Sequence, residues 1–219
     1  MTDWQRTQNE EYLKLLSRRL NEPRLLWVDQ FVEIINRFAK DFRLRSGISI
    51  NDFGCNVGHF YRAIEAIEAI VSYRGYDISE TYLKIAKKNF SEAIFLNWDI
   101  SSSQLPEPAD IGIISATLEH IDDHQKAIKN LFDSSRELVI LRTFVGKKYI
   151  CENCLTEGAN EKYLIKQFTL DDLTLYAIET GWNWDFFVDN ATNGDPKFVC
   201  NAITVLRRQK IIVFKKLKK

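Results

Sequence analysis

The first forty residues carry apolar side chains at helical spacing and predict two helices. In residues 3–20, aromatic and leucine positions recur every three or four residues. A second helix is expected to begin at Pro23, with Asn21 as its cap, and to end near Phe42. Each helix has one apolar face, so each is expected to pack against a larger body.

From residue 48 onward, short apolar runs alternate with helix-periodic segments. Such alternation is typical of βαβ units and a parallel sheet, whose functional crevice lies at the carboxyl ends of the strands. Strands are expected at 48–53, 72–77, 94–97, 110–115 and 137–143, with helices at 58–71, 79–90 and 122–135.

The last third of the chain is expected to complete the sheet. Residues 144–168 are polar and irregular. Thr169 is expected to cap a helix that ends near Gly181. Two closing strands are predicted at 182–188 and 198–206.

These elements place the chain in the α/β class. We expect a Rossmann-like, seven-stranded, mostly parallel sheet flanked by helices, with an N-terminal helical extension. The expected division is 1–44 for the extension, as a substrate cap or a packing element, and 45–219 for the main domain.

Composition narrows the set of partners. The 219 residues include 30 basic and 30 acidic side chains, so the basic surplus expected of a nucleic-acid binder is absent. Only the segment 210–219 is locally basic, and a last strand with a solvated lysine end is preferred there over contact with RNA or a membrane. The chain shows no signal peptide and no apolar stretch of membrane-spanning length, which favours a cytoplasmic protein.

The candidate chemistry begins with a glycine-bearing loop after the first predicted strand. The loop contains Asp52, Gly54, Cys55, Asn56 and Gly58. Glycine lets a backbone approach a ligand closely, and the following helix N-terminus offers free N–H groups. The dinucleotide fingerprint fails because two of its three glycine positions are not glycine, and no Walker-type lysine follows.

The loop resembles the first motif of class I S-adenosyl-L-methionine (SAM)-dependent methyltransferases, small-molecule type. One motif glycine is replaced by Asn56, which tolerates a positive φ better than most residues. Three further motifs follow in order: a second strand that ends in Asp77, a third that leads to Asp99, and a fourth that runs into Leu118-Glu-His120. A late helix near residues 167–182 also fits the family.

The resemblance implies SAM as the cofactor and a set of residues that hold it. Asp77 would accept the two ribose hydroxyls, and Asp99 would accept the adenine amino group. The remaining contacts would come from Asp52, Gly54, Cys55, Asn56, Gly58, Ile78, Ile100, Ser115 and Ala116. Structural roles stay open, with Asp77 as a helix cap, Asp99 as a turn residue and Asp52 in a salt bridge.

Methyl transfer needs a base only when the acceptor must lose a proton. His120 is the leading candidate, with His124 and His59 behind it, although a structural role explains His120 equally well. The expected acceptor is a small molecule, such as a sugar or metabolite hydroxyl. The alternatives are an RNA or protein methyltransferase and a non-catalytic SAM-binding module.

The stretch after the fifth strand is expected to face the acceptor. It holds a Cys-x-x-Cys pair at Cys151 and Cys154, which is weak support for zinc because no second pair exists, so no metal is expected. The oligomeric state is left open. The side chains that could meet an anionic or sugar acceptor are Arg142, Lys147, Lys148, Tyr149, Lys162 and Tyr163.

Overall fold

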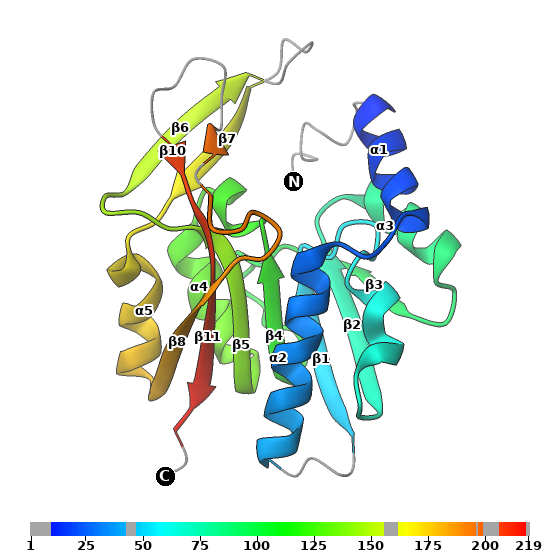
Figure 1. Ribbon diagram of the computed structural model, residues 1–219, viewed down its shortest axis with the longest axis horizontal. Coiled ribbons are helices and arrows are strands. Elements are labelled where there is room, and N and C mark those ends of the chain that lie inside the picture. The colour runs from blue at the N-terminus through cyan, green and yellow to red at the C-terminus, as the bar shows by residue number, and fades with distance from the viewer. Residues whose placement is uncertain (1–9, 43–46, 156–161, 196, 199–205, 218–219) are drawn as a thin grey trace.

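A seven-stranded sheet forms the centre of the computed structural model, which describes residues 10–42, 47–155, 162–195, 197–198 and 206–217 (Figure 1). The strand order is β3-β2-β1-β4-β5-β11-β8. All neighbours are parallel except β11, which runs antiparallel to both β5 and β8. The predicted seven-stranded, mostly parallel sheet is therefore confirmed. Its strands are β1 (Ile48–Phe53), β2 (Val71–Asp77), β3 (Ile94–Asn97), β4 (Ala109–Ser115), β5 (Ser135–Phe144), β8 (Trp182–Val188) and β11 (Gln209–Lys216).

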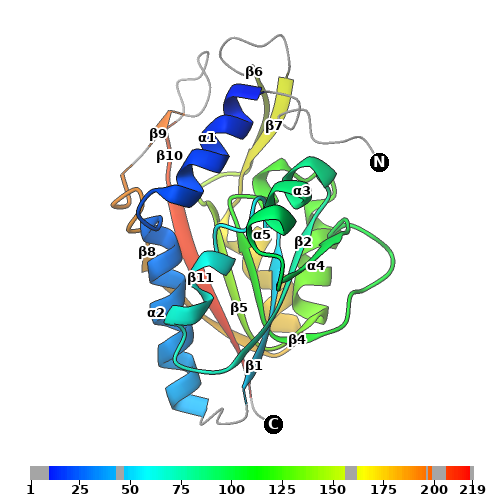
Figure 2. The same ribbon diagram turned by 90° about the vertical axis from the view of Figure 1, so that its right-hand side faces the viewer.

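Helices cover both faces of this sheet. The helix α2 (Leu26–Phe42) lies on one face, and α4 (His124–Asp133) and α5 (Leu170–Glu179) lie on the other (Figures 1 and 2). Along β5, Leu138 and Ile140 pack toward α2, whereas Val139 and Leu141 pack toward α4 and α5. Alternate side chains of a strand point to opposite faces, so a fully apolar strand such as β5 serves both layers.

Two helices bound the edge near β2 and β3. The helix α1 (Glu10–Asn21) buries Leu16 and Leu20 against Val57 and against Tyr82 of α3 (Glu80–Asn89). Ser79 caps α3, as predicted, by accepting a hydrogen bond from the Tyr82 amide. Among the described residues, no helix combines the length and apolar character needed to cross a membrane.

Several predicted elements differ in the structure. The second helix begins at Leu26 rather than Pro23, because the Leu25 carbonyl accepts the first helical hydrogen bond and Asn21 ends α1. Residues 58–71 hold a short 3-10 helix, η2 (Tyr61–Ala66), rather than an α-helix, since the Ala63 and Ile67 amides bond to carbonyls three residues back; β2 begins at Val71.

The segment 144–168 is not irregular. It forms an antiparallel hairpin of β6 (Ile150–Leu155) and β7 (Lys162–Gln167), which projects beyond the carboxyl ends of the parallel strands (Figure 1). The short pair β9 (Lys197–Phe198) and β10 (Leu206–Arg207) follows β8 in the chain, and residues 199–205 of the predicted strand 198–206 lie outside the described residues. The strand β11 enters the main sheet between β5 and β8 and overlaps the basic segment 210–219, where a last strand was expected. The predicted closing strand 198–206 is wrong for its described residues, since Phe198 and Leu206 pair with each other outside the main sheet.

A buried ion pair joins β5 to the loop after β8. The Arg142 guanidinium donates from Nε and Nη2 to both carboxylate oxygens of Asp189 at 3.0 and 3.1 Å, and Nη2 also donates to Gln209 Oε1. Burial raises the pKa of Asp189, but the hydrogen bond and charge of Arg142 outweigh it and bring the net pKa below its usual range. Since Arg142 is committed to this pair, its predicted contact with an acceptor is wrong.

Replacing Asp189 by Ala is expected to lower the free energy of unfolding by about 3–5 kcal/mol, because a buried guanidinium loses its counter-charge. Lys40→Ala, which removes an exposed ion pair with Glu68, is expected to cost less than about 1 kcal/mol. Urea denaturation of both variants measures the difference. Equal losses would mean that the Arg142–Asp189 pair adds nothing beyond a surface contact.

Candidate functional site

The carboxyl ends of β1, β2, β3 and β4 meet at one edge of the sheet, where the sequence placed its candidate residues. The loop after β1 adopts three left-handed residues, at Gly54 (φ 72°), Asn56 (φ 54°) and Gly58 (φ 89°). The prediction that Asn56 takes a positive φ is confirmed. The amides of Gly54 and Cys55 both donate to the Tyr76 carbonyl, which ties the loop to β2.

Asp77 organises this loop from the end of β2. Its Oδ2 accepts the Asn56 amide at 2.9 Å, and its Oδ1 accepts the Ser79 amide at 2.9 Å. Asp77 is buried, and it is Ser79, not Asp77, that caps α3. The neighbouring Ile78 directs its carbonyl to the side-chain amide of Asn97, which joins the ends of β2 and β3.

Asp52 is a second buried carboxylate beneath the loop. Its Oδ2 accepts a 2.7 Å hydrogen bond from the Tyr73 hydroxyl. Only the pairing register of β1 and β2 brings these two residues together, so the sequence pattern did not predict the contact. Burial is the main reason that the pKa of Asp52 is raised to about 7. The Tyr73 hydrogen bond lowers this pKa, and the charge of Asp77 raises it. Across the described part of the chain, no ion pair joins Asp52 to a lysine or arginine, so its predicted alternative role in a salt bridge is not seen.

The buried Cys55 thiol lies next to these carboxylates. Burial raises the pKa of Cys55 well above its usual value, and the charges of Asp77 and Asp52 raise it further. The thiol is therefore protonated and unreactive. Cys55 contributes to the loop through its backbone amide, which donates to the Tyr76 carbonyl, rather than through its sulfur.

The turn after β3 carries Asp99 and Ile100. Asp99 Oδ1 accepts hydrogen bonds from the amide and the hydroxyl of Ser101, at 2.8 and 2.6 Å, so Asp99 does act as a turn residue. Ile100 is buried in the core cluster on the α4 face. This arrangement occupies one carboxylate oxygen of Asp99 and leaves the other for a ligand.

The end of β4 has a strained turn. Ala116 adopts a positive φ of 51°, which costs about 1–3 kcal/mol for a residue other than glycine. A Cβ at Gly54 would lie 2.2 Å from Thr117 Oγ1, so only glycine fits beneath this turn. The Ser115 hydroxyl is buried, and no hydrogen-bond partner for it exists among the residues that the structure describes.

His120 follows in a short 3-10 helix, η3 (Leu118–His120). Its Nδ1 lies 2.7 Å from the Leu164 carbonyl of β7. A carbonyl can only accept, so Nδ1 carries the proton, and Nε2 of the neutral ring is the basic nitrogen. The hairpin thereby sets the tautomer of the predicted base.

A buried lysine fixes the same loop. Lys166 of β7 donates to the Ile121 carbonyl at 2.5 Å and the Asp122 carbonyl at 2.7 Å, and it lies 3.2 Å from His124 Nδ1. Burial lowers the pKa of Lys166. Sequence reasoning missed Lys166 because the hairpin itself was not predicted.

The two lesser base candidates lie in less suitable surroundings. Burial, with the charges of Arg19 and Arg62, lowers the pKa of His59 to about 4. Burial and the neighbouring Lys166 lower the pKa of His124, whose ring stacks on Tyr149. A backbone hydrogen bond to Asp122 raises the pKa of His124 in part, and His59 Nε2 is buried with no hydrogen-bond partner among the residues that the structure describes.

The remaining acceptor-side candidates are dispersed. Lys147 and Lys148 are exposed beside the half-exposed Tyr149, and Cys151 is an exposed free thiol on β6. The side chains of Cys154, Lys162 and Tyr163 lie outside the described residues. In the described ranges, no group of three His, Cys, Asp or Glu side chains could hold a metal ion.

The residues at this edge suit SAM. The left-handed loop lets backbone approach the ligand, Asp77 presents two acceptor oxygens, and Asp52 offers a buried negative charge to a cationic ligand. The unpartnered Ser115 hydroxyl lies at the end of the neighbouring strand β4. Each of these features meets a chemical group that SAM contains.

Comparison with known proteins supports the same family. Residues 51–137 match the family model described as a methyltransferase domain. Malonyl-[acyl-carrier protein] O-methyltransferase of Bacillus anthracis is 26% identical over 128 residues. That match covers 54% of this chain and 47% of the relative, so it spans about half the relative's length.

Solved structures share the fold over more of the chain. Magnesium protoporphyrin IX methyltransferase (ChlM) from Synechocystis PCC 6803, with bound SAM, has a TM-score of 0.59 and 19% identity, covering 87% of this chain and 78% of that one. DesVI from Streptomyces venezuelae has a TM-score of 0.65 and 10% identity over 95% and 98% of the two chains. CalS10, an amino pentose methyltransferase from Micromonospora echinaspora, has a TM-score of 0.63 and 10% identity over 94% and 97%.

The matched region begins at Asn51 and includes the glycine loop and both buried aspartates, Asp52 and Asp77. Residues 51–137 are thus similar to the methyltransferase domain family, and the chain shares its fold with SAM-dependent methyltransferases of known structure.

Proposed function

We propose that this protein transfers a methyl group from SAM to a small-molecule acceptor that carries a hydroxyl group, such as a sugar or another metabolite. The observation that carries the proposal is the left-handed loop at 54–58, which lies between the two buried carboxylates Asp52 and Asp77. Burying two acids costs free energy that a cationic ligand would offset.

In this proposal each strand end binds one part of SAM. Asp77 and Ile78 hold the ribose, Asp99 and Ile100 hold the adenine, and the Gly54–Gly58 backbone with Asp52 lies along the methionine part. Ser115 and Ala116 complete the methionine side. Because α1 packs on Val57 within the glycine loop, we further propose that residues 1–44 act as a cap on the domain 45–219.

SAM, when bound, supplies a methyl group on a sulfonium that is already activated for displacement. The chain's own task is then to orient the acceptor, exclude water and take up the acceptor proton. His120 is proposed as the base, since its Nδ1–H is fixed on the Leu164 carbonyl and Nε2 can accept the hydroxyl proton. The hairpin β6–β7 is proposed to form the acceptor wall, with Lys147 and Lys148 supplying positive charge.

A second acceptor class is an acyl group on a carrier protein. The similarity to malonyl-[acyl-carrier protein] O-methyltransferase favours it, and an acid acceptor would need no base. Charge balance argues against RNA as the acceptor. A non-catalytic SAM-binding module would bind the cofactor without turnover on any acceptor.

Asp77→Ala is expected to weaken S-adenosylhomocysteine binding by about a hundredfold or more, because two charge-assisted hydrogen bonds to the ribose are lost. Isothermal titration calorimetry measures the change. Asp110→Asn is the control, since Asp110 accepts from Ser49 at the opposite end of the sheet and should leave binding unaffected. Unchanged affinity in Asp77→Ala would refute the ribose assignment.

The affinity for SAM is expected to rise about tenfold between pH 6 and pH 8. The pKa of Asp52 is about 7 in the free protein, and the cationic ligand binds best to its ionised form, so proton loss must precede tight binding at low pH. Titrations at several pH values measure this. Asp52→Asn should bind more weakly with no rise, and a rise that persists in Asp52→Asn would assign it to another group.

His120→Asn is expected to lower kcat on a hydroxyl acceptor by about a hundredfold or more while cofactor binding is retained. The Asn amide can still donate to the Leu164 carbonyl, so the loop keeps its anchor while the base is lost. Transfer of labelled methyl from SAM to a panel of hydroxylated sugars, metabolites and acyl-carrier substrates measures turnover. Full activity in His120→Asn would exclude it as the base, and no turnover on any acceptor would favour the binding module.

A further inference from the structure

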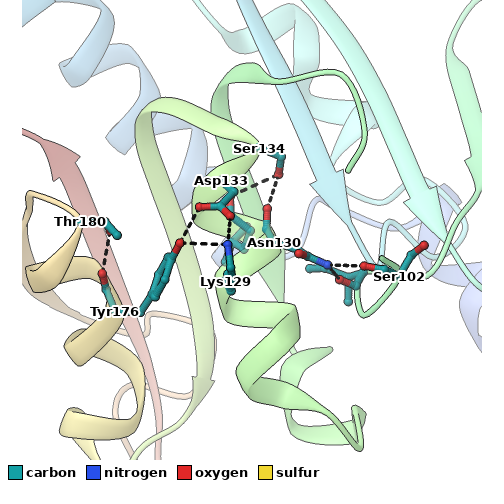
Figure 3. A network of polar contacts seen from close by, with 9 residues as sticks. Ser102, Lys129, Asn130, Asp133, Ser134, Tyr176 and Thr180 are labelled. Atoms are coloured by element: carbon teal, nitrogen blue, oxygen red, sulfur yellow. Dashed lines mark hydrogen bonds and ion pairs between the residues drawn. The ribbon is translucent and has the colours of Figure 1, made fainter. Parts of the chain in front are cut away.

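The turn that follows β3 is held by a side chain from α4. Asn130 Nδ2 donates one hydrogen bond to the Ile100 carbonyl at 2.7 Å and another to the Ser102 carbonyl at 2.8 Å (Figure 3). Asn130 is only 6% exposed, so these donors are satisfied by the turn rather than by water. The turn is closed by a 2.9 Å hydrogen bond from the Ser102 amide to the Asp99 carbonyl. The side-chain amide of Asn130 therefore fixes both the middle and the end of the turn at residues 99–102.

The same turn sets the direction of the Asp99 carboxylate. Both the amide and the hydroxyl of Ser101 donate to Asp99 Oδ1, so the carboxylate cannot rotate without breaking two hydrogen bonds. Ser101 lies between the two carbonyls that Asn130 holds. Loss of Asn130 would leave both carbonyls without their buried donor and release the turn, and Asp99 would move with it.

The helix that carries Asn130 is itself well anchored. The Ser134 hydroxyl donates to the Asn130 carbonyl at 2.7 Å. On the outer side of α4, Lys129 pairs with Asp133, and Tyr176 of α5 donates to Asp133 at 2.6 Å (Figure 3). Asn130 therefore transmits the position of a fixed helix to a turn at the ligand edge.

We infer that Asn130 is a positioning residue that sets the purine selectivity of the cofactor site, by holding Asp99 where it can accept the 6-amino group of adenine. The inference rests on the proposed function, because it assumes that an adenine ring binds beside the turn. Asn130 does not touch the ligand in this account. Its effect on binding passes through the backbone of residues 99–102.

The test compares two ligands that differ at the purine 6-position: S-adenosylhomocysteine and its 6-oxo analogue, S-inosylhomocysteine. Wild-type protein is expected to prefer the amino ligand by roughly tenfold to a hundredfold, as for a hydrogen bond to a charged group. Asn130→Ala should reduce this preference to less than about threefold, mainly through weaker binding of the amino ligand. Tyr176→Phe is the control and should keep the wild-type preference, since Tyr176 supports α4 from the side away from the turn.

Asn130→Asp provides a conservative variant in case Asn130→Ala does not fold. A protonated aspartic acid can donate one of the two hydrogen bonds, so an intermediate preference is expected, and thermal melting confirms folding. A preference that stays at the wild-type level in the folded Asn130 variants, or an equal loss of both ligands, would overturn the inference. If wild-type protein binds the amino ligand without preference, the inference fails while the proposed function stands. If it binds neither ligand, both fail.

Discussion

The hydrogen bond from the Asn56 amide to the Asp77 carboxylate joins the ends of the two strands on which the site depends. Asp77 is buried beside a loop whose backbone turns through left-handed conformations at Gly54, Asn56 and Gly58. The amides of Asn56 and Ser79 supply hydrogen-bond donors to both carboxylate oxygens, so burial of Asp77 is tolerated. Together with the Gly54 and Cys55 amides, which donate to the Tyr76 carbonyl, the Asn56–Asp77 contact fixes the position of the loop relative to β2.

Asp52 lies below the same loop in a different electrostatic state. Asp77 receives two backbone amides, whereas Asp52 receives one hydroxyl, from Tyr73, and faces the charge of Asp77. Burial raises the pKa of Asp52 to about 7, although its one hydrogen bond, from Tyr73, lowers it. A cationic ligand beside Asp52 would therefore favour the ionised form of this carboxylate.

The acceptor side is organised by contacts from β7 to the loop after β4. Leu164 and Lys166 offer a carbonyl and an ammonium to residues 120–122, so the hairpin and the predicted base form one unit. The buried Arg142–Asp189 pair fixes the neighbouring end of β5. The proposed cofactor side is built from strand ends and the proposed acceptor side from a hairpin anchored to them, an arrangement in which acceptor preference could vary on a constant fold.

The sequence by itself determined the sheet, the order of its motifs and the left-handed Asn56, because apolar periodicity, capping residues such as Ser79 and glycine spacing are local signals. Only the tertiary structure decided the roles of Tyr73, Asn130 and Lys166, since each meets a partner more than twenty residues away in the chain. The structure also shows that Arg142 pairs with Asp189 instead of facing an acceptor. The sequence could not predict this pair, because no local pattern connects the two residues. The hairpin escaped prediction for a related reason: its strands are polar and pair only with each other, so they lack the apolar pattern that burial against a core imposes on β1 to β5.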